Sequence, residues 1–284
     1  MLENSALCYD LHSHSIASDG VLTPAELVAR ASRCGVDVLA LTDHDGLSGV
    51  PEAQLAAEKY GIKLVSGVEI SVTWNNYLLH IVGLCVDHTN QALQEGLEKI
   101  RETRTDRAHE MARRLEVYGI ANVLEGVMKH ASGEVISRSH FACFLIEKGY
   151  AKDQKQVFKN FLVSGKPGYV ATEWATLEET INWIRGAGGI AVIAHPARYK
   201  MSATKFRKLL AEFKLLGGAS IEVLSSSHSF DESIKMSAYA QKFDLYASQG
   251  SDFHRPNTPC VELGRLPKMP VGCTPVWESP EWRV

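Results

Sequence analysis

The stretch that organises this chain is residues 9–20, which read YDLHSHSIASDG. His12 and His14 lie two positions apart, and side chains two apart on a strand point to the same face. Both imidazoles can therefore reach one metal ion, and Asp19, after a short polar turn, can bring a carboxylate to the same place. Because a single His-x-His also occurs at ordinary polar strand ends, the pattern indicates a metal site only if other strands end in similar residues.

Apolar runs alternate with helical patterns along most of the chain. After the first strand, further strands are predicted at residues 36–41, 62–68, 78–86, 190–194, 220–224 and 245–248. Helices are predicted between them at residues 24–35, 50–60, 177–185, 203–216 and 231–243. Continuous apolar runs are typical of buried parallel strands, and this alternation is typical of α/β folds. No Gly-x-Gly-x-x-Gly follows a predicted strand, so a closed or nearly closed β/α barrel is favoured over an open dinucleotide-binding sheet.

The alternation is interrupted by a long segment with helical patterns alone, residues 87–165. Its longest predicted helix, residues 90–118, carries Arg and Glu at i, i+4 spacing and ends at Gly119. We therefore expect a barrel domain formed by residues 1–86 and 166–284, with residues 87–165 as an inserted helical subdomain.

The overall charge excludes one class of partner. Lys and Arg total 30 and Asp and Glu total 33, so the chain has no excess positive charge with which to bind long DNA. Any recognition of phosphate must be local. The sequence shows no signal peptide and no apolar run long enough to span a bilayer, so we expect a cytoplasmic protein without membrane contact.

Metal-ligating residue types recur at or just beyond the ends of the predicted strands. They are His12, His14, Asp19, His44, Glu69, His80, His195, Asp252 and His254. Six of the eleven histidines of the chain belong to this set. Since buried polar groups need partners, so many of them on one face of a barrel indicate a metal cluster that supplies those partners.

At these residues the sequence resembles the PHP (polymerase and histidinol phosphatase) family of metal-dependent phosphoesterases. The motifs are Asp-Leu-His-Ser-His with Ser-Asp-Gly, Thr-Asp-His-Asp, Gly-Val-Glu, Ala-His-Pro and Gly-Ser-Asp-Phe-His, and all of them lie within residues 8–254. The resemblance implies a distorted (β/α)7 PHP barrel.

The resemblance also implies three metal positions. One would be held by His12, His14, Glu69 and Asp252, a second by Glu69, His80 and His195, and a third by Asp19, His44 and His254, with Glu69 bridging the first two. Glu69, His195 and Asp252 are the predicted catalytic residues, and Asp43 is expected to orient a neighbour. Imidazole and carboxylate ligands suit Mn²⁺, Fe²⁺ or Zn²⁺, and we expect two or three divalent ions per chain, with Mn²⁺ favoured.

Motifs in and around the insertion narrow the resemblance to a bacterial branch of the family. They are Ser-Arg-Ser-His-Phe-Ala at 137–142, Lys-Pro-Gly-Tyr at 166–169 and Ala-His-Pro-Ala-Arg-Tyr at 194–199. Members of this branch remove the 3′-phosphate from nucleoside 3′,5′-bisphosphates such as pAp, by attack of a metal-bound hydroxide, and some trim short 5′-phosphorylated RNA. Arg138, His140, Arg198 and Lys166 are the candidates for holding a second phosphate.

Two other functions stay open on the sequence. One is a histidinol-phosphate type phosphatase, whose substrate carries one phosphate and an amine and would not explain several cationic residues in the insertion. A non-catalytic, metal-stabilised PHP module of a larger complex is the second alternative, although all nine ligand positions are filled here. The sequence leaves undecided the metal, the base preference, the balance between mononucleotide and oligoribonucleotide substrates, and the oligomeric state.

Overall fold

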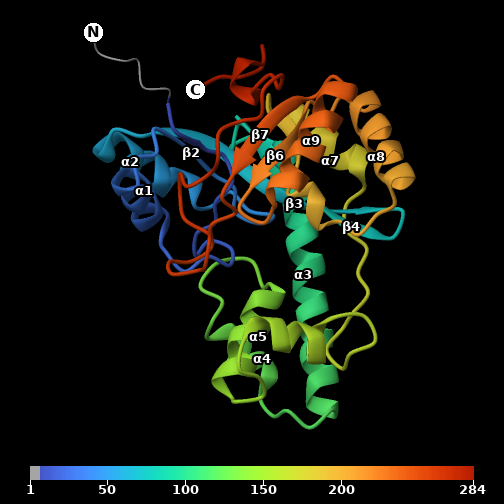
Figure 1. The fold of residues 1–284 in the computed structure, drawn as a ribbon. Helices are drawn as coiled ribbons and strands as arrows, with labels where there is room; N and C mark the ends of the chain where they lie inside the picture. The colour runs from blue at the N-terminus through green and yellow to red at the C-terminus, as the bar shows by residue number, and fades with distance from the viewer. Residues whose placement is uncertain (1–6) are drawn as a thin grey trace.

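The structure is a computed structural model that describes residues 7–284, so residues 1–6 of the predicted barrel segment lie outside it. Within the described residues, seven strands form one sheet in chain order. They are β1 (Tyr9–Asp10), β2 (Val38–Leu41), β3 (Lys63–Trp74), β4 (Tyr77–Leu84), β5 (Ile190–Ile193), β6 (Ser220–Ser225) and β7 (Tyr246–Gly250). The sheet curves back on itself, because the N–H of Leu11 donates to the carbonyl of Gln249 at 3.0 Å and Ser13 bridges Phe253. The predicted nearly closed barrel is thereby confirmed (Figure 1).

One part of the barrel differs from the predicted strands. β3 continues to Trp74 instead of ending near Val68, and β4 returns antiparallel to it, from Tyr77 opposite Trp74. Asn75 and Asn76 form the two-residue turn with φ of 46° and 65°, as a type I′ hairpin requires. Because β4 is also antiparallel to β5, it runs against the direction of the other strands. Glu69 and His80 therefore lie inside strands, and the prediction that they lie at strand ends is wrong.

Helices cover the outside of the barrel, as Figure 1 shows. They are α1 (Pro24–Arg33), α2 (Val50–Tyr60), α7 (Leu177–Gly186), α8 (Ala203–Leu215) and α9 (Phe230–Lys242). Thr23 caps α1 in a capping box with Glu26, which satisfies two backbone N–H groups at the helix start. Such local signals explain why the helix starts were predictable from the sequence.

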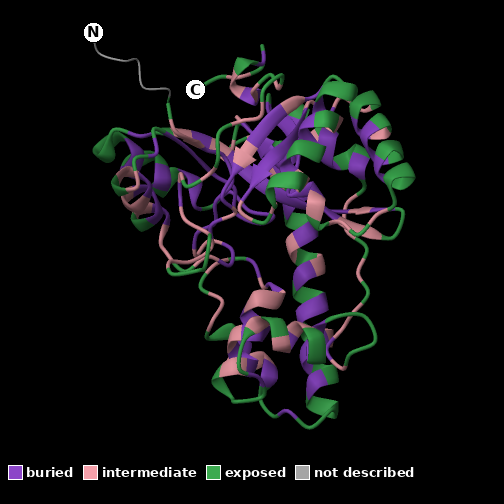
Figure 2. Cartoon of the chain, viewed as in Figure 1, coloured by how far each residue is buried: buried purple, intermediate pink, exposed green. Residues whose placement is uncertain are grey.

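The segment between β4 and α7 is helical. It contains α3 (Gln91–Val117), α4 (Val123–Met128), α5 (Arg138–Glu147) and α6 (Gln154–Val157), which continues into a π-helical turn, η1 (Phe158–Leu162). The boundaries at 87 and 165 stay a prediction, because α3 belongs to two apolar cores. Its first half places Leu97 in the barrel core, and its second half places Leu115 in a separate core that also contains Phe141 (Figures 1 and 2).

The chain after Gly264 passes over the far end of the barrel from the insertion (Figure 1). A short 3₁₀ turn, η3 (Val276–Glu278), buries Val276 completely, and Trp277 stacks on Tyr9 with the ring centroids 4.0 Å apart. Among residues 7–284, no helix combines the length and the apolar character that crossing a membrane requires.

Candidate metal centre

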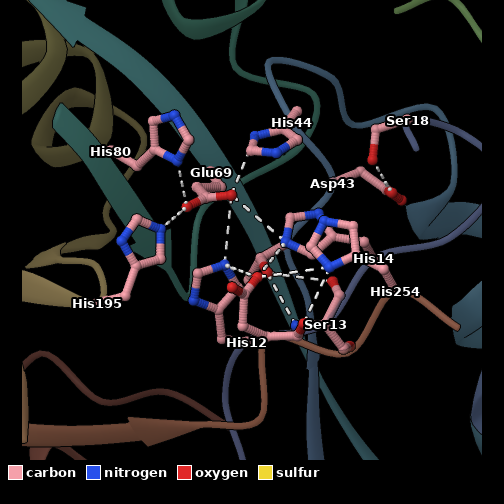
Figure 3. A network of polar contacts seen from close by, with 12 residues as sticks. His12, Ser13, His14, Ser18, Asp43, His44, Glu69, His80, His195 and His254 are labelled. Carbon is pink, nitrogen blue, oxygen red and sulfur yellow. Dashed lines mark hydrogen bonds and ion pairs between the residues drawn. The ribbon is translucent and has the colours of Figure 1, made fainter. Parts of the chain in front are cut away.

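The predicted ligands come together inside the end of the barrel that faces the insertion. They come from the turns after β1 (His12, His14, Asp19), β2 (His44), β5 (His195) and β7 (Asp252, His254) and from β3 (Glu69) and β4 (His80). Figure 3 shows the imidazoles arranged around the carboxylate of Glu69. The barrel therefore gathers side chains that are up to 242 positions apart, His12 and His254, into one cluster.

Glu69 lies at the centre of this cluster and is 1% exposed. Its Oε1 lies 2.8 Å from Nδ1 of His80 and 2.9 Å from Nε2 of His195. Its Oε2 lies 3.0 Å from Nδ1 of His44 and 3.3 Å from Nε2 of His12. One carboxylate facing imidazoles on both oxygens is the arrangement that a bridging ligand needs.

The ligand atoms separate into three overlapping groups, each with its atoms within 4.8 Å of one another. The groups are His12, His14, Glu69 and Asp252; His44, Glu69 and His80; and His14, Asp19, His44 and His254. The first matches the expected set. The other two groups differ from the expected sets. His44 lies close to both Glu69 and Asp19 and so belongs to two groups. His195 belongs to none of the three groups, although its Nε2 contacts Oε1 of Glu69.

The unsatisfied polar atoms of the centre test whether these residues fit metal ions. Among residues 7–284, several buried nitrogen and oxygen atoms have no hydrogen-bond partner. Those in the centre are His12 Nε2, both ring nitrogens of His14, Asp19 Oδ1, His44 Nδ1, Glu69 Oε2 and His195 Nδ1. Burial of such atoms without a partner costs free energy, and a divalent cation coordinated by them removes that cost. The donor set is nitrogen and oxygen throughout, so the residues fit several divalent ions.

Three of the ligands, Glu69, His14 and His80, have protonation states that agree with this fit. Burial raises the pKa of the Glu69 carboxyl, yet the imidazoles of His80, His44 and His12 outweigh it and hold the pKa well below its usual range. Burial lowers the pKa of His14 to about 3 and that of His80 to about 4. Both imidazoles are therefore neutral at pH 7, which is the form that coordinates a metal.

A carboxylate that the sequence analysis missed orients two of the ligands. Glu222, in β6, is 1% exposed; its Oε1 lies 2.6 Å from Nδ1 of His12, and its Oε2 accepts the backbone N–H of His195 at 2.5 Å. A partner on Nδ1 fixes the tautomer of His12 and leaves Nε2 free to coordinate. The signal in the sequence was a glutamate inside an otherwise apolar strand, Ile221 to Leu224.

Asp43 has the orienting role that was expected of it. Its carboxylate accepts hydrogen bonds from the N–H and the hydroxyl of Ser15 and from the hydroxyl of Ser18. These bonds hold the turn between His14 and Asp19 in place, and Figure 3 shows the one from Ser18.

The centre opens into a cavity of about 170 Å³ between the barrel and the insertion. On the barrel side the cavity is lined by metal-ligating residues. On the insertion side it is lined by Arg104, Arg107, Ser137, Arg138, Ser139 and Phe158. The hydroxyl of Ser137, the residue that caps α5, donates to Oδ2 of Asp19 at 3.0 Å, so the start of α5 is tied directly to the centre.

Comparison with known proteins places the chain in a family. The PHP domain model matches residues 10–214. The chain belongs to the PHP domain family. This PHP protein is 47% identical over 276 residues to a 3′,5′-nucleoside bisphosphate phosphatase of Chromobacterium violaceum, with 97% of each chain covered. It is 44% identical to the 5′-3′ exoribonuclease Rnm of Escherichia coli K12, covering 97% of this chain and 94% of the relative.

The fold of this PHP protein is also found in a solved structure. An amidohydrolase from C. violaceum, crystallised with bound sulfate and no metal, superposes with a TM-score of 0.92 at 47% identity. The alignment covers 95% of both chains, so it includes the barrel and the insertion.

The four residues expected to hold a second phosphate lie in different places in this PHP protein. Arg138 lines the cavity, with its guanidinium 5.4 Å from the ring centroid of Phe158. Arg198 also lines the cavity, and its Nη1 donates to Oδ2 of Asp252 at 2.9 Å. Arg198 is therefore hydrogen-bonded to one of the proposed metal ligands.

His140 and Lys166 lie away from the cavity, in contrast to the expectation. Nδ1 of His140 accepts the backbone N–H of Ser137, so this ring completes the cap of α5, and its burial lowers its pKa. Lys166 is exposed and lines a separate surface hollow beside Arg114 and Tyr118. Neither side chain lines the cavity of the centre.

Proposed function

We propose that this chain is a metal-dependent phosphoesterase that removes the 3′-phosphate from nucleoside 3′,5′-bisphosphates, such as pAp to AMP. We propose that it also hydrolyses short 5′-phosphorylated oligoribonucleotides from their 5′ end. The observation that carries the proposal is one cavity with two unlike walls, a nitrogen and oxygen cluster on the barrel and arginines on the insertion. The two relatives named as a bisphosphate phosphatase and an exoribonuclease support the same substrate class.

Two or three divalent ions per chain, with Mn²⁺ our first choice, would be held by the nine clustered side chains. When bound, such ions lower the pKa of a coordinated water and neutralise the oxygens of the phosphate under attack. The proposed ligands are His12, His14, Asp19, His44, Glu69, His80, His195, Asp252 and His254. Glu69 would bridge two ions, because both of its oxygens face imidazoles.

The other side chains of the cavity would position the substrate. Arg138 is proposed to hold the phosphate that is not cleaved, since a guanidinium binds phosphate oxygens through two parallel hydrogen bonds. Arg198, bonded to Asp252, would guide the reacting phosphate towards the centre. Glu69, His195 and Asp252 are the proposed catalytic residues, because each touches both the ion positions and the cavity. The cytoplasmic location stays a prediction.

A phosphate-release assay with Mn²⁺ tests the proposal. The substrates are a nucleoside 3′,5′-bisphosphate, the matching 3′-monophosphate and 5′-monophosphate, and histidinol phosphate. We expect the bisphosphate to have the highest kcat/KM, release of its 3′-phosphate alone, and loss of activity in excess chelator. A preference for histidinol phosphate, or full activity in chelator, would contradict the proposal.

A further inference from the structure

Helix α3 is joined to the metal centre by a buried ion pair. Arg104, in the middle of α3, donates from Nε to Oδ2 of Asp45 at 2.6 Å. The side chain of Asp45 is completely buried, and that of Arg104 is 6% exposed. The guanidinium of Arg104 also lies 5.1 Å from the ring centroid of Trp174, a contact that restricts its orientation. Because Asp45 directly follows His44, this ion pair connects α3 to a turn that carries a proposed ligand.

The backbone of Asp45 is held from two further sides. Its N–H donates to the carbonyl of Glu69 at 2.9 Å, and its carbonyl accepts Nη1 of Arg101 at 3.1 Å. Asp45 has a φ of 47°, in the left-handed region that a non-glycine residue adopts at a cost in free energy. Such a conformation persists only where surrounding contacts impose it, so the position of His44 depends on these bonds.

A serine of β3 completes the network. Ser71 donates its backbone N–H to Oδ1 of Asp45 at 2.7 Å and its hydroxyl to Oδ2 at 3.0 Å. The same hydroxyl accepts Nη2 of Arg104 at 2.8 Å. Ser71 is two positions beyond Glu69 in β3 and lies opposite His80 of β4 in the strand register. We refer to Arg104, Asp45 and Ser71 as the α3 clamp.

The α3 clamp adjoins every member of one ligand group, because it follows His44 in the chain, shares a strand with Glu69 and faces His80 across the hairpin. Figure 3 shows His44 and His80 on either side of Glu69. We propose that the α3 clamp positions these three ligands for one divalent ion, and that Arg104 is the positioning residue that the insertion supplies. The inference rests on the proposed function and gives the insertion a second task, the support of an ion position.

The group that contains His12, His14 and Asp252 is held by other bonds. The N–H of Asp252 donates to the carbonyl of His12 at 2.9 Å, and the N–H of His14 donates to the carbonyl of Phe253 at 2.9 Å. The ring of His12 is oriented by Glu222. None of these bonds involves the α3 clamp. A substitution in the clamp should therefore weaken the ion position beside His44 and leave an ion bound in this group.

The first test measures metal binding without turnover. Arg104→Met keeps the length of the side chain and removes its charge and its donors. Calorimetric titration of chelator-treated protein with Mn²⁺ should show at least one ion bound roughly tenfold or more weaker than in wild type, and at least one bound within about threefold of wild type. Arg113→Met, at an exposed arginine of the same helix, is the matched control and should bind Mn²⁺ as wild type does.

A second variant guards against a folding defect. Arg104→Met leaves the buried carboxylate of Asp45 without its cation, which by itself destabilises a protein. The double variant Asp45→Asn/Arg104→Met removes both charges, so its thermal unfolding without metal should lie closer to that of wild type. Its weakest Mn²⁺ site should still be impaired, because the bonds that position His44 are missing.

The third test separates positioning from a structural role by kinetics. In Arg104→Met, the Mn²⁺ concentration that gives half-maximal phosphate release from a nucleoside 3′,5′-bisphosphate should rise by about tenfold or more, while kcat at saturating Mn²⁺ recovers to within about fivefold of wild type. Arg104→Lys keeps the charge without the planar fork of donors, so it should show a smaller rise.

The outcomes also separate this inference from the proposed function. Equal Mn²⁺ affinities in wild type, Arg104→Met and the double variant would overturn the inference, and so would an equal weakening of every bound ion. A rise in KM for the bisphosphate that excess Mn²⁺ does not remove would place Arg104 in contact with the substrate and overturn it as well. If Mn²⁺ binding changes as expected but the wild type hydrolyses no bisphosphate, the proposed function is wrong while the α3 clamp stands.

Discussion

The two walls of the cavity are built from opposite chemistries. On the barrel wall, His12, His14, His44 and the other imidazoles face carboxylates, so that most charges are balanced within the wall. On the insertion wall, Arg107 and Arg138 have no carboxylate partner among the described residues. The barrel wall is therefore suited to hold cations, and the insertion wall is suited to hold an anion.

This difference assigns two tasks to two parts of the chain. Under the proposed function, the metal cluster would bind any phosphate and supply the reaction, and the arginines would select the substrate by binding a second phosphate at a fixed distance from the first. Helix α3 sets that distance, because Leu97 packs it into the barrel core and Leu115 packs it into the insertion core.

The largest loss of activity is expected from a substitution of Glu69, the carboxylate at the centre of the barrel wall. Glu69→Gln removes the charge that faces imidazoles on both carboxylate oxygens, so the ion positions on either side should be lost together. We expect kcat to fall by roughly 10³-fold or more on every phosphate ester, with a parallel loss of bound metal. Elemental analysis beside steady-state kinetics checks both. Near-wild-type turnover and metal content would show that Glu69 is not a bridging ligand.

Removal of an arginine from the insertion wall should lower the activity on one substrate and leave the activity on another nearly unchanged. Arg138→Ala is expected to lower kcat/KM on a nucleoside 3′,5′-bisphosphate by about 10²-fold, at roughly 1.4 kcal/mol for each decade. Hydrolysis of an aryl phosphate should change far less, because no metal ligand is touched. The two assays are run on the same preparation of the variant. Equal losses on both substrates would place Arg138 in a structural role.

The balance of charge within the barrel wall predicts a pH dependence in chelator-treated protein. Burial lowers the pKa of His254, but Asp19 and Asp252 outweigh it and raise the pKa to about 9. The folded state thus favours the protonated ring, and this stabilisation is complete below pH 6.5 and disappears as the pH rises to 9.

We expect the free energy of unfolding to fall across that range by an amount on the order of 1 to 2 kcal/mol after allowance for solvent screening, and the midpoint of thermal unfolding to fall with it. His254→Gln, which cannot titrate, should show a flatter profile between pH 6.5 and 9. Scanning calorimetry at several pH values measures the difference. An identical slope in wild type and variant would mean that His254 is not protonated in the metal-free fold.

The smallest change in activity is expected from a substitution of Lys166, which lies away from the cavity. Lys166 is exposed beside Arg114 and Tyr118, so Lys166→Ala should alter kcat/KM on the bisphosphate less than about twofold. The same assay as for Arg138 measures it. A loss selective for the bisphosphate would show that the anion-binding wall extends further along the insertion than the cavity does.

The alternation of strands and helices in the barrel and all nine proposed ligands could be predicted from the sequence by itself. Most of the ligands lie in or next to an apolar run, and a His or carboxylate in that setting is conspicuous because burial of such groups is costly. Local capping signals such as Thr23 with Glu26 similarly marked the helix starts. These features depend on residues close together in the chain, so they can be read without knowing the fold.

The tertiary structure decided which charges face one another. Arg107 and Lys166 look alike in the sequence, as cations among many on helices or turns, and packing alone buries one and exposes the other. The antiparallel return of β4, which brings His80 back to Glu69, and the contact of Glu222 with His12 are likewise long-range pairings. Side-chain direction on a helix or across a barrel is fixed by such packing, and a local pattern does not contain it.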